Sequence, residues 1–402
     1  MNVRSIGIAS SLLVAAFAIA CGGSSRRSGF GTETDPTLAA DGGTGQGGFV
    51  GGDPGKGSEC SINNVETDLD KDYDGDGFAL KDDCNECNTS INKGAHDIPG
   101  NGIDEDCSGT ADDEEVDCDG SLSKSGSDPF DGAKAMGLCK KADPNGREWG
   151  VIEAKWVMPD GKSLNNMEGV GILEKLGVNV PQMGASMLVL SSGSAREPSD
   201  PEYDSASNMK GYKHGTPPGY PKESPACPGV KTGQAQDGVA LEIKIRVPSN
   251  AQSFSYQQNF FTWEYPNYIC DRYNDFFVTM MDPIPDGLPD GNIAFDQDTN
   301  PISVNNSLLQ VCTPGSHGQT GKMKNFPCPL GPDSLSGTGF EGHAATGWLT
   351  TSAPVTPASE ITLRFAIWDS GDGALDSTVL IDDFKFSVEG ADTAQTKPTP
   401  VN

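Results

Sequence analysis

Two short acidic segments constrain this sequence more than any other feature, because each has the spacing of a twelve-position calcium-binding loop. The first loop is Asp72–Asp83 and the second is Asp104–Glu115. Calcium takes six to eight oxygen ligands at roughly 2.4 Å, so the chain must fold alternate carboxylates back onto one point. Gly77 and Gly109, at position six of their loops, permit the left-handed backbone that such a turn requires.

Each loop offers oxygen atoms at the expected positions. The first supplies four carboxylates and one main-chain carbonyl, from Asp72, Asp74, Asp76, Asp83 and Phe78. The second supplies Asp104, Asp106, Ser108, Asp112 and Glu115. An aspartate stands at position twelve of the first loop, where a longer glutamate is usual, and we expect it to weaken that site. The alternative is a solvated acidic linker, but a glycine at position six of both loops favours calcium.

The negative charge of the chain is concentrated around these loops. The formal net charge is −29. Residues 59–119 contain twenty acidic residues and only three lysines. Nucleic acid is therefore not expected as a partner, because a polyanion needs basic patches. Divalent cations would relieve this self-repulsion, so we expect residues 59–119 to form an acidic module that needs Ca²⁺ to fold.

Three segments of the acidic module, 72–77, 82–85 and 101–109, have a recognisable pattern. On these segments the module resembles the MopE-type metal-binding repeat of bacterial surface proteins and, more distantly, the thrombospondin type-3 and dockerin calcium repeats. The resemblance implies a compact, strand-poor module built around calcium, with a disulfide between Cys84 and Cys107.

The cysteine count favours an oxidising compartment. Apart from Cys21 the chain has ten cysteines, an even number that is compatible with five disulfides. The sequence alone leaves their connectivity open. Zinc bound by Cys84 and Cys87 is the competing interpretation, but a second closely spaced pair of zinc ligands is missing.

The N-terminus has the features of a secretory signal, with Arg4 before an apolar run at 6–20 that is too short to span a membrane. The sequence Ala18-Ile19-Ala20-Cys21 resembles the lipobox of bacterial lipoproteins. The resemblance implies that residues 1–20 are removed and that Cys21 carries the lipid that holds the protein to a membrane. An ordinary cleaved signal peptide is the alternative. Residues 21–58 are rich in Gly and Ser and are expected to form a disordered tether.

Residues 120–390 have the composition of a globular, mainly β domain, and residues 391–402 are expected to be a disordered tail. In 239–247 apolar residues alternate with mostly polar ones, which is typical of a strand with one buried face. Similar runs predict strands at 150–157, 186–190, 239–247, 254–263, 276–281, 361–368 and 378–388. Short helices are expected at 129–139 and 167–176. Together these elements predict a β-sandwich or jelly-roll-like domain with a few short helices.

Acidic residues near strand ends form a second candidate metal or ligand site, at Glu264, Asp275, Asp372 and Asp376. The simpler interpretation is that these side chains cap turns or face solvent. A surface glycoside hydrolase that uses these acidic loops is the alternative function. The four histidines lie outside any recognisable nucleophile or zinc motif, so we do not expect an enzyme and name no catalytic residue.

The segment 263–277 resembles the choice-of-anchor L domain of bacterial surface proteins, as do 133–139, 291–294, 301–306 and 369–377. We therefore expect a protein of the cell envelope, lipid-anchored at the outer membrane or cell surface of a Gram-negative bacterium. Calcium would be structural, and the β domain would serve adhesion by binding an extracellular polysaccharide or protein ligand.

Overall fold

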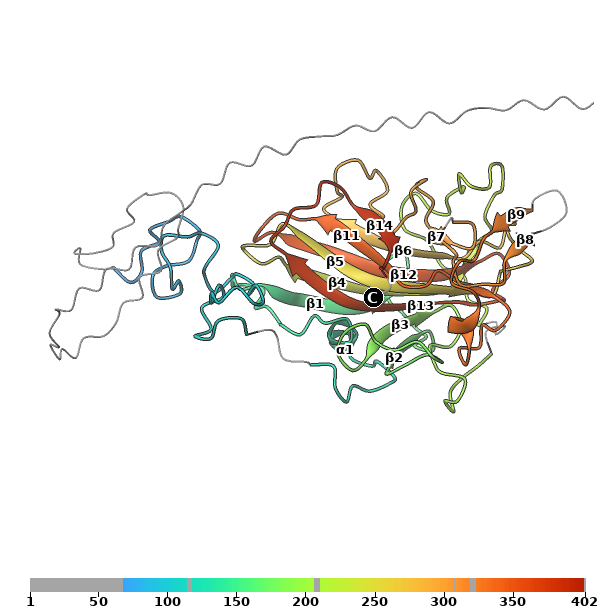
Figure 1. Ribbon diagram of the computed structural model, residues 1–402, viewed down its shortest axis with the longest axis horizontal. Coiled ribbons are helices and arrows are strands. Elements are labelled where there is room, and N and C mark those ends of the chain that lie inside the picture. The colour runs from blue at the N-terminus through green and yellow to red at the C-terminus, as the bar shows by residue number, and fades with distance from the viewer. Residues whose placement is uncertain (1–67, 114–117, 206–209, 307, 319–322, 401–402) are drawn as a thin grey trace, which may run out of the picture. The chain divides into compact units, whose positions relative to one another are not determined.

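The computed structural model describes residues 68–113, 118–205, 210–306, 308–318 and 323–400, all of which belong to one compact unit, Gly57–Asn402 (Figure 1). The expected signal peptide, lipidated Cys21, tether and calcium ligand Glu115 lie outside the described residues. In the part of the chain that is described, no helix has the length and apolar character needed to cross a membrane.

One antiparallel sheet has five strands, in the order β1-β4-β12-β6-β7. Its strands are β1 (Gly150–Val157), β4 (Ala235–Arg246), β6 (Phe276–Asp282), β7 (Ile302–Ser303) and β12 (Glu360–Ser370).

The second antiparallel sheet has seven strands, in the order β14-β11-β5-β13-β3-β2, with β10 also paired to β5. Its strands are β2 (Val170–Leu173), β3 (Met187–Ser191), β5 (Ser253–Thr262), β10 (Ala344–Ala345), β11 (Leu349–Pro354), β13 (Ser377–Ser387) and β14 (Gln395–Pro398). Outside the two sheets lie the helix α1 (Pro129–Lys134), the hairpin of β8 (Gly315–His317) and β9 (Lys324–Phe326), and the single-turn helix η1 (Asp333–Leu335).

Alternation along the strands creates the core, as β4 illustrates. Leu241, Ile243 and Ile245 are fully buried, whereas Glu242 between them pairs with Arg364 of β12. The predicted strands at 150–157, 186–190, 239–247, 254–263, 276–281, 361–368 and 378–388 correspond to β1, β3, β4, β5, β6, β12 and β13. The expectation of a mainly β fold is confirmed.

The two sheets pack face to face through large aromatic side chains. Tyr256 of β5 meets Phe365 of β12 edge-on, with ring centroids 5.1 Å apart. The Tyr256 hydroxyl donates a hydrogen bond to Oγ1 of Thr279 on β6 at 2.6 Å, so its polar end is satisfied inside the core. Apolar residues of both sheets form one continuous core, which makes the domain a β-sandwich.

Both helix predictions need correction. The helix expected at 129–139 ends at Lys134, since Gly137 has a φ of +95° and the carbonyl of Met136 accepts a bond from the Phe384 amide instead of continuing the helix. The helix expected at 167–176 is wrong, because Val170–Leu173 forms β2 and pairs with β3. All four residues of β2 are buried, so tertiary pairing overrides the apparent helical spacing.

The tail also differs from expectation. Within the segment 391–402, Gln395–Pro398 forms the edge strand β14 and pairs with β11. Its Thr396 is buried, and its hydroxyl lies 2.8 Å from that of Thr351. A polar Thr and Pro composition therefore does not prevent pairing when an open sheet edge supplies the hydrogen bonds.

Packing between the sheets should dominate the stability of the β domain. We expect Phe365→Ala, which empties a fully buried position against Tyr256, to lower the free energy of unfolding by roughly 3–5 kcal/mol. Thr362→Ala, on the partly exposed face of the same strand, is the matched control and should change it by less than about 1 kcal/mol. Urea unfolding of the oxidised protein measures both, and equal losses would contradict this account of the core.

Candidate cation site in the acidic module

The acidic module folds through turns alone, since residues 68–113 contain neither helix nor strand. In its first loop Asp72 accepts hydrogen bonds from the amides of Gly75 at 2.6 Å and Gly77 at 2.9 Å. Gly77 has a φ of +96°, the left-handed conformation that its position in the loop predicts. The side chain of Asp72 thus closes the turn and directs the following carboxylates to the same side.

Carboxylate oxygens of the first loop converge in two groups. Asp74, Asp76 and Asp83 form one group, and Asp72, Asp74 and Glu86 form the other, with the oxygens of each group within 4.8 Å of one another. Oxygens bound to one calcium ion lie no farther apart than about 5 Å, so both groups have suitable spacing. The main-chain amide of Phe78 donates to Asp76 at 2.7 Å, and the role expected for the Phe78 carbonyl stays a prediction.

Glu86 lies outside both predicted loops, between Cys84 and Cys87, and the loop spacing does not predict it as a ligand. In the structure it is 2% exposed, and its Oε2 accepts a bond from the Tyr73 amide at 2.6 Å. Glu86 lies three residues after Asp83, the last position of the first loop, so the twelve-position pattern does not include it.

Two carboxylates of the first loop each have a buried oxygen without a hydrogen-bond partner. Asp83 is 4% exposed, and its Oδ2 has no hydrogen-bond partner, nor has the Oδ2 of Asp74. Burial and repulsion from Asp76, Glu86 and Asp74 raise the pKa of Asp83 to about 7. Burial and neighbouring carboxylates likewise raise the pKa values of Asp74 and Glu86. An unpaired buried carboxylate is costly unless a proton or a cation compensates it, and oxygen-only ligands suit a hard cation.

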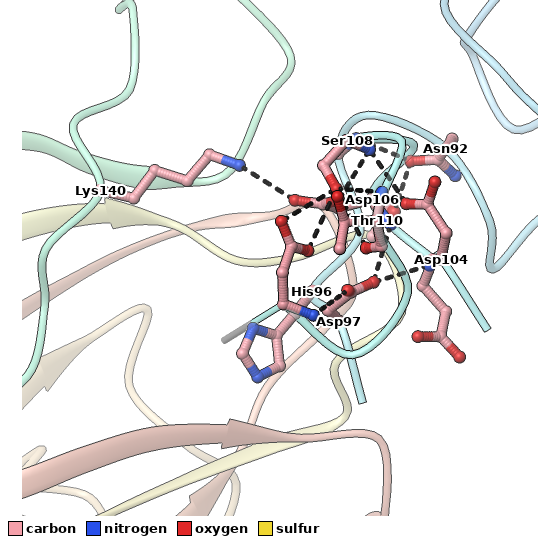
Figure 2. A network of polar contacts seen from close by, with 12 residues as sticks. Asn92, His96, Asp97, Asp104, Asp106, Ser108, Thr110 and Lys140 are labelled. Carbon is pink, nitrogen blue, oxygen red and sulfur yellow. Dashed lines mark hydrogen bonds and ion pairs between the residues drawn. The ribbon is translucent and has the colours of Figure 1, made fainter. Parts of the chain in front are cut away.

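The second loop is closed in the same manner. Asp104 accepts bonds from the amides of Ser108 and Gly109, both at 2.9 Å, and Gly109 has a φ of +96°. Its converging group consists of Asp97, Asp106 and Asp113. Figure 2 shows Asp97 reaching into the loop from the preceding segment, with Lys140 approaching Asp106 from the other side at 4.0 Å.

Two members of this second group, Asp97 and Asp113, are not among the ligands that the sequence predicts. Asp112, the expected ligand, instead accepts bonds from the amides of Asn101 and Gly102 at 2.8 and 2.9 Å, and Asp113 takes its place beside Asp97. The Ser108 hydroxyl contacts the Asp113 carboxylate at 3.1 Å. Asp97 is held by the amides of Glu105, Asp106 and Asp113, while burial and its contact with Asp113 raise its pKa to about 6.

Disulfides stabilise the acidic module and its neighbourhood. Cys84 and Cys107 are bonded, which links the two loops and confirms the pairing that the resemblance implied. Cys87 is also disulfide-bonded, so it offers no thiolate for the zinc alternative. Among the described residues the structure also pairs Cys118 with Cys139, Cys227 with Cys270 and Cys312 with Cys328.

The acidic module contacts the turn between β4 and β5. The side chain of Asn250 accepts a bond from the His96 amide at 2.9 Å and donates to the His96 carbonyl at 2.8 Å. Asn92 is fully buried, donates to Asp76 at 2.7 Å and accepts from the Ser249 hydroxyl at 2.8 Å. One side chain therefore connects a carboxylate of the first loop to the β-sandwich.

The acidic residues proposed for the β domain lie at one end of the sandwich. Asp275 precedes β6 and Asp369 is the last residue but one of β12, while Glu264 follows β5 and Asp376 precedes β13, so each sheet contributes two carboxyl groups. All four are at most 1% exposed, whereas Asp372 is exposed. Asp369 thus takes the place that the sequence prediction gave to Asp372.

This second cluster differs chemically from the acidic module. Among the described residues, all groups of three carboxylates with oxygens within 4.8 Å lie in the acidic module. Asp275 accepts bonds from the Ser370 amide and the Ser377 hydroxyl. Burial and mutual repulsion raise the pKa of Glu264 and of Asp369 to about 10 and that of Asp275 well above its usual value. In the absence of a cation, burial and repulsion thus favour the protonated form of these carboxyls, and a metal site there stays a prediction.

One small cavity lies beside the cluster. The cavity that Asp376 lines, together with Ser191 and Tyr203, has a volume of about 10 Å³, which is room for roughly one water molecule. A glycosidase needs two carboxyl groups that face a sugar across an open cleft.

Fold and site together define a disulfide-bonded β-sandwich that carries an acidic, turn-rich module. Residues 151–387 match the choice-of-anchor L domain family, and the chain belongs to that family. Membership indicates a surface-associated protein. No curated protein matches the chain.

The buried carboxyl cluster should make the stability of the β domain depend on pH. The folded protein keeps protons on carboxyls whose pKa is about 10, while the unfolded chain releases them near pH 4 to 5, so the free energy of unfolding falls as the pH rises between these values. The loss is at most about 1.4 kcal/mol per pH unit for each such carboxyl. We expect Glu264→Gln, which stays neutral, to reduce this slope.

Urea unfolding in chelator at pH 6 and pH 8 measures this slope. Asp286→Asn is the control, because Asp286 is exposed and is not among the charges that raise the pKa of Glu264 or Asp369, and it should leave the slope unchanged. An identical slope in Glu264→Gln and the parent would refute the assignment of a buried, protonated Glu264.

Proposed function

We propose that this is a lipid-anchored cell-surface protein in which Ca²⁺ holds the acidic module in its folded shape and the β domain binds an extracellular ligand. The calcium proposal is carried by one observation. Asp83 is almost completely buried beside Asp74 and Asp76, with its Oδ2 unpartnered. A hard divalent cation is the ligand that matches this arrangement of oxygens.

The lack of regular structure supports a folding role for the metal. Residues 68–113 contain turns alone, so the hydrogen bonds of helices and sheets contribute little to the stability of the module. Because residues 59–119 include twenty acidic residues, compensation of their charge contributes more. Binding energy at such a site becomes folding energy, because the unfolded chain does not hold the ligands together.

The calcium proposal predicts a stability that depends on metal. A concentration of Ca²⁺ one hundred times its Kd stabilises the folded state by about 2.7 kcal/mol. We expect calcium to protect residues 68–113 of the full oxidised chain from proteolysis, and chelator to remove that protection. Asp83→Asn should lose most of the protection.

The matched control for this experiment is Asp70→Asn. Asp70 belongs to the same module but is exposed and pairs with Lys81, outside both converging groups of the first loop. It should behave as the parent. Equal cleavage of the parent in calcium and in chelator would show that the module does not need the metal.

Aromatic residues at one end of the sandwich support the adhesion proposal. Tyr268 and Tyr273 are half-buried and meet edge-on at 5.3 Å, and Arg272 lies 4.7 Å from the Tyr273 ring centroid. Such rings stack on sugars or on apolar peptide side chains. Because the protein carries a net charge of −29, a neutral polysaccharide is a better candidate than an acidic one.

Binding to immobilised neutral polysaccharides tests the adhesion proposal. We expect Tyr273→Ala to weaken binding roughly tenfold, as loss of a binding hot spot does, and Tyr273→Phe to retain it because the ring remains. Equal binding by Tyr273→Ala and the parent would exclude this surface.

A further inference from the structure

The five carboxylates of the first loop do not gather around one point. Asp72 and Glu86 belong to one converging group and Asp76 and Asp83 to the other, and only Asp74 belongs to both. Oxygens that bind one calcium ion lie within about 5 Å of one another, so a single ion cannot contact all five carboxylates in this arrangement. We propose that the first loop binds two divalent cations, bridged by the carboxylate of Asp74, and this inference rests on the calcium proposal above.

The charge of the loop supports two ions. The five carboxylates carry five negative charges when ionised, so one divalent cation leaves three uncompensated and two leave one. The lysines of the module are engaged elsewhere. Lys81 pairs with Asp70 and Lys93 with Asp82, both outside the five, and Lys71 lies over the Tyr73 ring at 4.1 Å. Arg147 donates to the Gly77 carbonyl.

The burial of one carboxylate in each of the two groups that share Asp74 also supports two cations. Asp83, in one group, is 4% exposed with an unpartnered Oδ2, and Glu86, in the other, is 2% exposed. Asp74 itself accepts a bond from the Asp76 amide on Oδ1, and its Oδ2 is unpartnered. Each group therefore contains one deeply buried carboxylate, and the shared residue keeps an oxygen available for a metal. Without a cation, the Oδ2 atoms of Asp83 and Asp74 would stay buried without a partner.

Glu86 is the residue that distinguishes two cations from one. A twelve-position calcium loop ends at Asp83, and Glu86 lies beyond it, held by the Tyr73 amide at 2.6 Å. Glu86 completes a second group that the loop template does not contain. Replacing Glu86 should therefore remove one ion and leave the other, which Asp76 and Asp83 still bind.

Calcium stoichiometry in the full oxidised chain tests the proposal, by native mass spectrometry and calorimetry. An Asp106→Asn background removes a member of the second loop's group, and losses are counted relative to it. We expect Glu86→Gln to lose one ion, Asp83→Asn to lose one, and the double variant to lose two. Asp74→Asn should lose both, and Asp70→Asn none. Retained Cys84–Cys107 linkage and an unchanged β-domain melting transition verify that each variant is folded.

The outcomes separate this inference from the calcium proposal. If the double variant loses only one ion, or Glu86→Gln loses none, the loop holds one cation, so the two-cation inference is overturned while the calcium proposal stands. If the background protein binds no calcium that any of these variants removes, both are overturned.

Discussion

The desolvation of carboxylates is the constraint on which this structure depends. Taking an ionised carboxylate out of water costs several kcal/mol unless a proton, a hydrogen-bond network or a cation compensates it. Two clusters of buried carboxyl groups in the described part of the chain have different surroundings. In the acidic module the oxygens of Asp74, Asp76 and Asp83 converge, whereas Glu264 and Asp369 at the end of the sandwich belong to no such group of three among the described residues. Convergence of oxygens favours a shared cation, whereas burial without such convergence favours protons.

The sandwich and the acidic module depend on different sources of stability. Between the sheets, large apolar side chains such as Phe365 are fully buried, and this packing needs no metal. The module has few such residues, and Phe78 and Ile91 are among those it buries. The Cys84–Cys107 disulfide and the contacts of Asn92 and Asn250 with the β4–β5 region limit its freedom. These links do not neutralise the carboxylates of the module, and the proposed cations would do so.

Local periodicity explains why much of the fold was predictable. In β4 and β12 apolar residues alternate with polar ones, a period that only a half-buried strand satisfies. Prediction failed where partners far along the chain decide the conformation. Val170–Leu173 has no local preference strong enough to resist pairing with β3, and Gln395–Pro398 is ordered by the edge of β11. A short stretch of sequence around either strand does not contain the strand with which it pairs.

The sequence by itself determined the two acidic loops, because ligand spacing and the glycine at position six are properties of consecutive residues. It also determined the mainly β class, through the period of two. Only the tertiary structure decided which carboxyl groups share a site. Glu86 and Asp97 enter from outside the loops, Asp113 takes the position expected of Asp112, and Asp369 replaces Asp372 at the end of the sandwich. Sequence spacing places residues along the chain, but the turns and strand ends that bring side chains together are set by long-range packing.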